Sequence, residues 1–542
     1  MHTAITTKIN FALRAGILVI ISVVLAVSAV ADPKKTLQKA QKALRAGDFE
    51  RAEKLYREVL QKDEKDVAAR LGLSKTLLKQ RRLSEAFEEA AYVRNMNPSS
   101  APAHALLGSA ILAAGVFPQA IGEFRVALNL DADESVAIAG LAMVDFYENR
   151  TLDCVEKLRR AVAIDPQEPD YVFSLGQAAA RSEKYSEAAD AYERFLMIAP
   201  STDAERRARI RGLIDFLRYL GAQSSLYSVG GAPRTVMPFE SLDNRPILKV
   251  RINGSKETLR FVLDTGSGMS VISEQTARKL NLRPVAHGGL ARAVGGEGRF
   301  EIVYGYLNSM ELGDVRIDNV PVYIRHFYDM HNPVDGYLGI AALSRLMTAV
   351  DYGTRRLTLV RQKNRTDQGP FVDQAAKGAP DSIEVRPGVD IPVRTTSSGF
   401  LSGEVVIDGI AKPLNFIIDT GATVTVLSER AAAMEEAVGF IQEHRMRVFG
   451  AAGITDDVKT AVLPKIAIGS YTREKVNAAV LNLEPINETA GFQQSGILGG
   501  NFLRHFRVVF DFQRAIVRLE PLEFANAPKD SMPWETTTQG QP

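Results

Sequence analysis

The chain has 542 residues, which is too long for one ordinary hydrophobic core, so we expect two to four domains. Hydrophobic residues make up 46% of it and charged residues 24%, a composition typical of a globular protein. The net charge of +2 provides no general attraction to nucleic acid or anionic membranes. Because Cys154 is the single cysteine, the chain cannot form an intramolecular disulfide, a cysteine-rich zinc site or an iron–sulfur cluster from its own residues.

The N-terminus has the pattern of a secretory signal peptide. Lys8 and Arg14 precede an apolar run, Ala15–Ala31, which ends in the small-x-small cleavage pattern Ala29-Val30-Ala31. We therefore predict a signal peptide over residues 1–31 and a periplasmic or secreted bacterial protein. Without cleavage, the run would anchor the protein in a membrane, and no second hydrophobic span follows it.

A period of 34 residues runs through the helical pattern of residues 33–223. Small residues recur at this interval, and most are followed four positions later by a larger apolar residue, such as Tyr56 or Phe124. These small residues are Ala52, Ala86, Ala120, Cys154 and Ala188. Leucines at the same spacing each precede another small residue: Leu73-Ser74, Leu107-Gly108, Leu141-Ala142 and Leu175-Gly176. The pattern resembles about five tetratricopeptide repeats, in which stacked helix pairs bury their apolar faces against one another.

The end of the array has its own features. Ser201-Thr202-Asp203 provides an N-cap for a last helix, which runs to about Leu220 and shields the end of the stack. Four arginines wrap around this helix, and we expect them to form a solvated face, with docking to the second half of the chain or to an acidic partner as the alternative. They are Arg206, Arg207, Arg209 and Arg211. Cys154 occupies a position where the other units have alanine, so we expect a buried packing residue and not a nucleophile.

Beyond Gly230 the sequence pattern becomes that of short β-strands, and the same order of elements occurs twice. In the first copy a strand ending at Ile252 is followed by the hairpin turn Asn253-Gly254 and by the strand Leu259–Leu263. The corresponding elements of the second copy are a strand ending at Ile407, the turn Asp408-Gly409 and the strand Leu414–Ile418. We predict that each copy finishes on one strand, from Val350 to Leu359 in the first copy and from Phe510 to Leu519 in the second.

Each copy also carries three motifs in the same order. The first is an apolar pair followed by Asp-Thr-Gly, at Asp264-Thr265-Gly266 and Asp419-Thr420-Gly421. The second is a glycine-rich hairpin tip, at Val294–Gly298 and Phe449–Gly453, and the third is a glycine after two apolar residues, Gly339 and Gly499. Two carboxylates held a hydrogen bond apart cannot both ionise, so Asp264 and Asp419 would supply one base and one acid.

The duplicated motifs resemble those of the retropepsin and pepsin superfamily of aspartic peptidases, and the short lobes are most similar to a tandem of bacterial retropepsin-like domains. The resemblance implies a multidomain protein, with an all-α repeat solenoid followed by two all-β lobes over residues 235–362 and 384–524. A polar linker, residues 363–383, joins the lobes, and we predict a disordered tail over residues 525–542. Each lobe pairs either with the other or with its twin in a second chain.

The resemblance also implies roles for individual residues. Asp264 and Asp419 are the expected catalytic pair, and Thr265 and Thr420 brace the opposite loops. Gly266, Gly421, Gly339 and Gly499 support the site, and the last two allow close approach of a strand behind each loop. Gly295, Gly296, Gly450 and Gly453 are flap candidates. Neither a metal nor an organic cofactor is expected.

These observations predict an exported aspartic endopeptidase that acts on polypeptides with a water activated by the Asp dyad. The helical repeats are expected to bind the substrate or a protein partner, and no nucleic-acid partner is expected. The alternative is a non-catalytic peptide-binding or envelope scaffold protein that retains a protease fold, because a protein can keep a fold and lose its chemistry.

Overall fold

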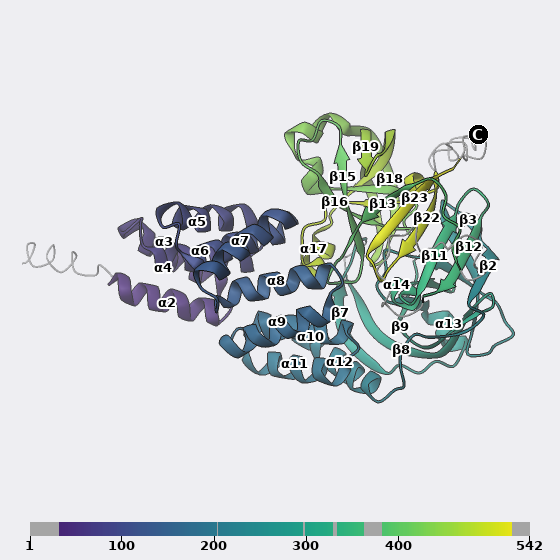
Figure 1. Cartoon of the computed structure of the whole chain (residues 1–542), viewed down its shortest axis with the longest axis horizontal. Helices are drawn as coiled ribbons and strands as arrows, with labels where there is room; N and C mark the ends of the chain where they lie inside the picture. The colour runs from purple at the N-terminus through teal and green to yellow at the C-terminus, as the bar shows by residue number, and fades with distance from the viewer. Residues whose placement is uncertain (1–31, 203, 296–298, 329–332, 363–381, 523–542) are drawn as a thin grey trace, which may run out of the picture. The chain divides into compact units, whose positions relative to one another are not determined.

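The structure is a computed structural model that describes residues 32–202, 204–295, 299–328, 333–362 and 382–522. It consists of a helical array followed by two β-rich lobes (Figure 1), which confirms the predicted fold class. The predicted signal peptide, most of the predicted linker and the predicted tail lie outside the described residues. Within the part of the chain that is described, no helix has the length and apolar character needed to cross a bilayer.

Helices fill the described residues from 33 to 221. The five pairs are α2 (Pro33–Arg45) with α3 (Phe49–Lys62), α4 (Val67–Lys79) with α5 (Leu83–Met96), α6 (Ala101–Ala113) with α7 (Phe117–Leu130), α8 (Ser135–Tyr147) with α9 (Thr151–Ile164), and α10 (Pro169–Arg181) with α11 (Tyr185–Ile198). The array ends with α12 (Ala204–Gly221), close to the predicted last helix. Its predicted cap includes residue 203, which is not described.

The 34-residue period corresponds to close packing between helices. All five residues of the small-residue series are fully buried on the second helices of the pairs. The small residues of the leucine series lie on the first helices, where Ser74 Oγ donates a 2.8 Å hydrogen bond to the backbone oxygen of Ala86. A Cβ atom on Gly108 would lie 2.8 Å from the ring of Phe124, so a larger residue there would separate the helices.

The chain forms two compact units, and the boundary between them falls within α6, between Leu107 and Gly108. Cys154 lies in the second unit, on α9. Its side chain is fully buried, and burial raises the pKa of its thiol to about 12. This confirms the expectation of a packing residue, because the thiolate required of a nucleophile is strongly disfavoured there.

The first lobe is built mainly of strands. They are β1 (Ser228–Gly231), β2 (Arg234–Pro238), β3 (Glu240–Leu242), β4 (Arg245–Ile252), β5 (Leu259–Leu263), β6 (Ser270–Ser273), β7 (Ala286–Arg292), β8 (Arg299–Leu312), β9 (Val315–Arg325), β10 (Gly336–Leu338), β11 (Leu346–Asp351) and β12 (Arg356–Arg361), with short helices α13 (Glu274–Lys279) and α14 (Ile340–Leu343). The predicted strand Leu259–Leu263 is confirmed with the same bounds as β5.

The second lobe repeats this order. Its strands are β13 (Val389–Pro392), β14 (Arg394–Thr395), β15 (Leu401–Ile407), β16 (Leu414–Ile418), β17 (Thr425–Ser428), β18 (Ile441–Gly450), β19 (Gly453–Ile468), β20 (Tyr471–Leu481), β21 (Gly496–Leu498), β22 (Phe506–Asp511) and β23 (Ile516–Pro521). Its short helices are α16 (Glu429–Ala432), a 3-10 turn (Glu435–Phe440), α17 (Glu484–Ala490) and α18 (Gly500–Leu503). The predicted strand Leu414–Ile418 is β16, again with the same bounds.

The prediction of one final strand per lobe is wrong, because each lobe ends in a hairpin. The side chain of Asp351 accepts a 3.0 Å hydrogen bond from the backbone N–H of Thr354 and reverses the chain between β11 and β12. Asp511 makes the equivalent 3.1 Å bond with Arg514 between β22 and β23. Each turn closes on a residue with positive φ, which the apolar pattern did not reveal.

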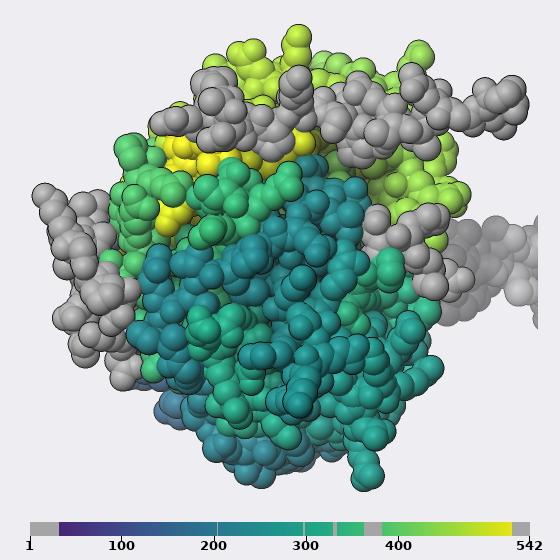
Figure 2. All heavy atoms as spheres, turned by 90° about the vertical axis from the view of Figure 1, so that its right-hand side faces the viewer, coloured from purple at the N-terminus to yellow at the C-terminus, as the bar shows by residue number. Residues whose placement is uncertain are grey.

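These two hairpins join the lobes. β11 pairs antiparallel with β22 in a six-stranded sheet of order β13-β23-β22-β11-β12-β2, so strands of both lobes share one hydrogen-bonded layer (Figure 1). Teal and green atoms of the first lobe directly adjoin yellow atoms of the last strands in Figure 2. The lobes of a single chain therefore pair with each other.

The buried environment of Cys154 predicts that its thiol is unreactive in the folded protein. We expect no modification by a thiol reagent at pH 8 in native buffer and complete modification in denaturant. A Cys154→Ala variant should keep the helical content, whereas Cys154→Leu should lose about 1–3 kcal/mol of stability through overpacking. Rapid labelling of the native protein, followed by mass spectrometry, would contradict this packing role.

Candidate active site

The two Asp-Thr-Gly loops follow equivalent strands. β5 leads into Asp264 and lies between β4, to which it is antiparallel, and β10, to which it is parallel. β16 leads into Asp419 and lies between β15 and β21 in the same way. The backbone N–H of each aspartate donates a 3.0 Å hydrogen bond to a leucine oxygen of the parallel strand, Leu338 or Leu498. The duplicated sequence thus produces two loops with the same local support.

The threonines connect the loops across the two lobes. Thr265 Oγ1 donates to the backbone oxygen of Ile418 at 2.8 Å and accepts the backbone N–H of Thr420 at 3.0 Å. Thr420 Oγ1 donates to the backbone oxygen of Leu263 at 2.6 Å and accepts the N–H of Thr265 at 3.2 Å. Both threonines are fully buried, so no water competes for these four bonds.

The glycine of each loop lies directly against the carboxyl group of the other loop. A Cβ atom on Gly266 would be 2.3 Å from Asp419 Oδ2, and one on Gly421 would be 2.4 Å from Asp264 Oδ1. Any side chain at either position would separate the two acids. The structure therefore brings the predicted pair together and shows why glycine is required on both sides.

The other two predicted glycines lie behind the loops. A Cβ on Gly339 would be 2.6 Å from the backbone carbon of Met269, and one on Gly499 would be 2.4 Å from the backbone oxygen of Val424. Both contacts involve backbone atoms, which cannot move aside as a flexible side chain can. These glycines thus let the ends of β10 and β21 pass close behind the two loops.

The two carboxyl groups have unequal affinities for a proton. Burial raises the pKa of Asp264 above its ordinary value, but hydrogen bonds from Ser267, Asp419 and Gly266 oppose this rise. Burial raises the pKa of Asp419 well above its ordinary value, and the nearby charge of Asp264 raises it further. The pair therefore holds one proton, which we assign to Asp419, and one negative charge on Asp264.

Ser267 is a residue of this site that the sequence reasoning missed. Its hydroxyl donates a 2.5 Å hydrogen bond to Asp264 Oδ2, whereas the equivalent position in the second lobe is Ala422, which offers only a backbone N–H at 3.2 Å from Asp419 Oδ1. The extra donor stabilises the carboxylate form of Asp264. The difference between Ser267 and Ala422 in otherwise matching motifs was a usable sequence cue.

Two hairpins, β7–β8 and β18–β19, meet at their tips. The backbone N–H of Ala452 donates a 3.0 Å hydrogen bond to the oxygen of Val294, and the guanidinium of Arg325 donates to the oxygen of Ala451. The tip positions leave no room for side chains, since a Cβ on Gly295 would lie 2.5 Å from the oxygen of Gly453. Of the predicted flap glycines, Gly295, Gly450 and Gly453 lie at this contact, whereas Gly296 is outside the described residues.

The hairpin of the first lobe is held by the last helix of the array. α12 packs on β7 so closely that a Cβ on Gly212 would be 2.0 Å from the backbone oxygen of His287. A register shift in β7 between His287 and Leu290 accompanies this contact. Phe216 of α12 also stacks on Tyr304 of β8, with ring centroids 4.3 Å apart.

This docking corrects the expectation of a purely solvated arginine face on α12. Arg209 donates a 2.8 Å hydrogen bond to the backbone oxygen of Leu290 in β7. Arg207 bonds the backbone oxygen of Leu196 at 2.7 Å, and Arg206 lies over the ring of Phe173. Arg209 therefore docks on the first lobe, which was the alternative expectation, whereas Arg211 is exposed.

The second lobe contacts the array at other helices. The ring of Phe492 packs edge-on against Phe117 of α7 at 5.0 Å and against Tyr147 of α8 at 5.1 Å. Asn415, one residue after the start of β16, donates to the backbone oxygen of Gly115. Within the compact unit that starts at Gly108, both lobes are therefore attached to the array.

The described residues contain no group of three or more His, Cys, Asp or Glu side chains that could hold a metal ion.

Known protein families match the two halves of the chain. The aspartyl protease family matches residues 248–342 and 403–502, and tetratricopeptide repeat families match residues 43–91 and 140–204. The chain therefore combines domains of the aspartyl protease family with a tetratricopeptide repeat array. A search of curated proteins finds no match.

Solved structures similar to this chain include tetratricopeptide repeat proteins. The tetratricopeptide repeat protein TTC0263 of Thermus thermophilus is 18% identical, with a TM-score of 0.30 over 34% of this chain and 99% of that one. PilF of Pseudomonas aeruginosa is 15% identical, with a TM-score of 0.26 over 35% and 87%. A tetratricopeptide repeat protein from Parabacteroides merdae is 13% identical, with a TM-score of 0.27 over 36% and 75%.

The raised pKa of Asp419 makes stability depend on pH. A carboxyl group whose pKa is higher in the folded than in the unfolded state stabilises the fold fully below its unfolded pKa, and this stabilisation is lost as pH rises through the folded pKa. The amide introduced by Asp419→Asn cannot ionise, so we expect this variant to unfold at a higher temperature than the wild type at pH 7. Each kcal/mol corresponds to about 2–4 °C for lobes of this size.

Thermal unfolding from pH 3 to pH 8 tests this expectation. The difference between Asp419→Asn and wild type should disappear in the acid range, where the wild-type carboxyl group is protonated in both states. Asp408→Asn, in an exposed hairpin turn, is the matched control and should follow the wild type throughout. A constant difference at every pH would show that Asp419 does not hold the proton.

The contact between α12 and β7 predicts opposite effects for two glycine-to-alanine changes. Gly212→Ala would place a methyl group 2.0 Å from a backbone oxygen, so we expect a loss of about 1–3 kcal/mol and faster hydrogen exchange in β7. Gly122→Ala, in α7 with open space around it, should stabilise the array by about 0.5–1 kcal/mol. Equal behaviour of the two variants in hydrogen exchange and thermal unfolding would contradict the docking.

Proposed function

We propose that this protein is an aspartic endopeptidase that hydrolyses peptide bonds in polypeptides. The observation that carries the proposal is the pair Asp264 and Asp419, which lie against each other in a buried, symmetric frame and have unequal proton affinities. A base and an acid at one point are what general acid–base hydrolysis of an amide needs.

In the proposed reaction the charged Asp264 takes a proton from a water molecule as the water oxygen attacks the carbonyl carbon of the scissile bond. Asp419 gives its proton to the carbonyl oxygen, which yields a neutral tetrahedral diol. The diol then collapses as a hydroxyl proton returns to Asp419. The carbon–nitrogen bond breaks, and the proton on Asp264 passes to the leaving nitrogen. Both carboxyl groups thereby regain their starting states.

The surrounding residues support the roles of Asp264 as the base and Asp419 as the acid. Ser267 keeps Asp264 in its charged form, and the four threonine bonds keep the two carboxyl groups in register. In this proposal the two hairpins that meet at Gly295 and Gly450 would act as the cover that excludes bulk water from a bound peptide. An extended substrate would lie between the hairpins and the loops as an additional strand.

We further propose that the protein is exported to a periplasmic or extracellular location, with residues 1–31 as the signal peptide. The support is the sequence pattern of that segment, namely two basic residues, an apolar run and a small-x-small site. In the same proposal the helical array binds the substrate or a protein partner, which is the usual use of such repeats.

A cleavage assay on denatured casein tests the proposed activity. Asp264→Asn and Asp419→Asn should each reduce the rate at least about 100-fold, the range typical of a general acid or base. The exposed Asp408→Asn variant should cleave at the wild-type rate. Activity should fall on the acid side as Asp264 gains a proton and on the alkaline side as Asp419 loses one.

Because burial raises both pKa values, we expect each limb of this profile to lie above the pH at which exposed aspartates titrate. Cleavage that survives either Asp→Asn change would refute the shared dyad. Absence of cleavage by the wild type over the whole pH range would favour a non-catalytic peptide-binding protein.

A further inference from the structure

A cavity of about 370 Å³ lies where the array meets both lobes, within the compact unit that starts at Gly108. The array contributes Leu213 and Leu217 of α12 to its wall. The first lobe contributes Met269, which follows the Asp264 loop, and the second lobe contributes Leu401 at the start of β15. No single domain forms this cavity, so the attachment of the array creates it.

The wall of the cavity is mainly apolar and aromatic. Phe216 and Tyr304 form one side as a stacked pair, and burial keeps the pKa of Tyr304 well above its ordinary value, so its hydroxyl stays neutral. Arg181 also lines the cavity, but its guanidinium bonds the backbone oxygen of Thr396 at 2.6 Å and lies over the ring of Phe146. Because these contacts engage Arg181, the cavity suits an apolar occupant better than an anion.

The cavity is joined to the dyad by a rigid loop. Ser267 holds the Asp264 carboxylate with its hydroxyl, and its backbone oxygen accepts a 2.9 Å hydrogen bond from Ile340. The next residue, Gly268, accepts a 3.0 Å bond from Ala341. Gly268, Ile340 and Ala341 all line the cavity. The same short segment thus supports the base on one side and forms the cavity wall on the other.

The chain length between the dyad and the cavity sets how far a substrate must reach. Met269 follows Asp264 by five positions, which limits the path between their Cα atoms to about 19 Å. An extended peptide spans about 3.3–3.6 Å per residue, so about five residues cover the longest possible path. A side chain that enters the cavity would therefore belong to a residue at most about five positions from the scissile bond.

We propose that this cavity is an outer substrate subsite, built jointly by the array and the lobes, that takes a bulky apolar or aromatic side chain of the polypeptide. The inference rests on the proposed peptidase function and extends it to specificity. Its volume lies at the lower end of the range for small-molecule sites, about 300–1,000 Å³, and leaves room for one large side chain with part of its neighbour. The array is in this view part of the substrate cleft.

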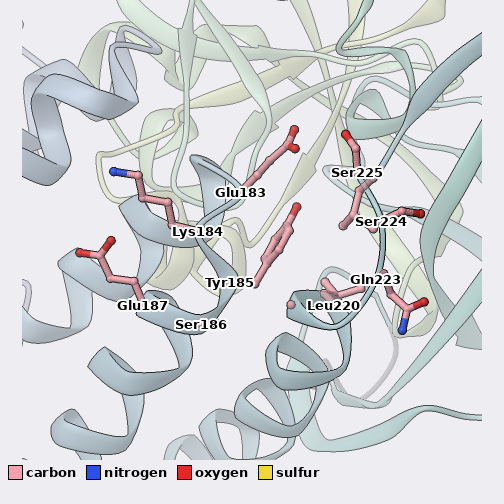
Figure 3. A pocket seen from close by; sticks show the side chains of 11 residues that line it. Glu183, Lys184, Tyr185, Ser186, Glu187, Leu220, Gln223, Ser224 and Ser225 are labelled. Carbon is pink, nitrogen blue, oxygen red and sulfur yellow. The ribbon is translucent and has the colours of Figure 1, made fainter.

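A second pocket of about 400 Å³ lies next to the first, between the start of α11 and the residues that follow α12 (Figure 3). The two share Glu183, Tyr185, Leu220 and Leu226 as wall residues. Figure 3 shows Tyr185 projecting from the start of α11 toward the segment that carries Ser225. This pocket is more polar than the first, which suits the backbone of a chain that continues beyond the apolar subsite.

Variants of Leu213 test the proposal, because this half-buried residue lines the cavity from the array side. Leu213→Phe reduces the space, and Leu213→Ala enlarges it. Met197→Phe, on the 77% exposed Met197 of α11, is the matched control. Helical content and thermal unfolding of each variant establish that α12 stays folded.

The substrates are quenched fluorescent peptides in which Phe or Ala is placed at each of the five positions on either side of the cleaved bond. For the wild type and for Met197→Phe, we expect Phe to raise kcat/KM at least about 10-fold over Ala at one position within about five residues of that bond. Leu213→Phe should abolish this preference, so that kcat/KM for the Phe peptide falls at least about 10-fold relative to the Met197→Phe control. Leu213→Ala should extend the preference to Trp.

Binding of the same peptides to Asp264→Asn, followed by fluorescence anisotropy, separates the two proposals. If no peptide is cleaved but the Phe peptide binds more tightly and Leu213→Phe removes the difference, the subsite stands and the peptidase assignment falls. If peptides are cleaved with no outer preference, or with one that Leu213→Phe leaves intact, the subsite is refuted and the peptidase stands. Binding of an apolar dye that the peptides do not displace would also refute the subsite, since the cavity would then hold a separate small molecule.

Discussion

The reciprocal hydrogen bonds between Thr265 and Thr420 are the constraint on which the geometry of the site depends. Each hydroxyl donates to a backbone oxygen of the other loop and accepts a backbone N–H from it, and neither is exposed to water. A buried polar group left without its partner costs about 1–3 kcal/mol. Because these partners belong to the opposite lobe, each loop needs the other lobe to complete its hydrogen bonds. The glycine contacts and the six-stranded sheet follow from this, because they require the same close approach of the lobes.

Within this symmetric frame, the difference between the two acids comes from small departures from symmetry. The bonds of the threonines, the supporting glycines and the strands behind them are duplicated, and they position the carboxyl groups without distinguishing them. One hydroxyl, that of Ser267, has no counterpart at Ala422. A hydrogen bond to a charged group contributes more than a neutral one, so this hydroxyl, together with the positive charge of Arg245, favours the charged form of Asp264. The residues that make the two loops symmetric are therefore not the residues that make the two acids chemically different.

The sequence predicted local structure well where one physical pattern dominated. Alternating apolar residues and a following turn gave β5 and β16 with the bounds that the structure has, and the 34-residue period gave the five helix pairs. The terminal hairpins were missed because Arg355 and Ala515 adopt positive φ, which neither residue type favours. Of the predicted site, the structure brings together both acids, both threonines and the four glycines that support them.

What the sequence did not reveal was contact between distant segments. Gly212 lies inside a helix, and the reason for a glycine there is β7, more than 70 residues later, which packs directly against it. The cavity beside Leu213 has the same origin, since its wall comes from three parts of the chain. Hydrophobic periodicity tells which side of an element is covered, but not by which partner, and both features depend on the partner.

The docking of α12 on the first hairpin has a consequence for how the cleft opens. The array restrains the β7–β8 hairpin, because moving this hairpin would require moving α12 and separating Phe216 from Tyr304. Among the described residues, no helix of the array packs on the β18–β19 hairpin in this way, and Phe449 and Ile454 beside its tip are exposed. In the proposed peptidase, the motion that opens the cleft would therefore fall on the second hairpin. The first hairpin would act as a fixed wall and the second as a moving cover, so a polypeptide would enter from the side of the second lobe.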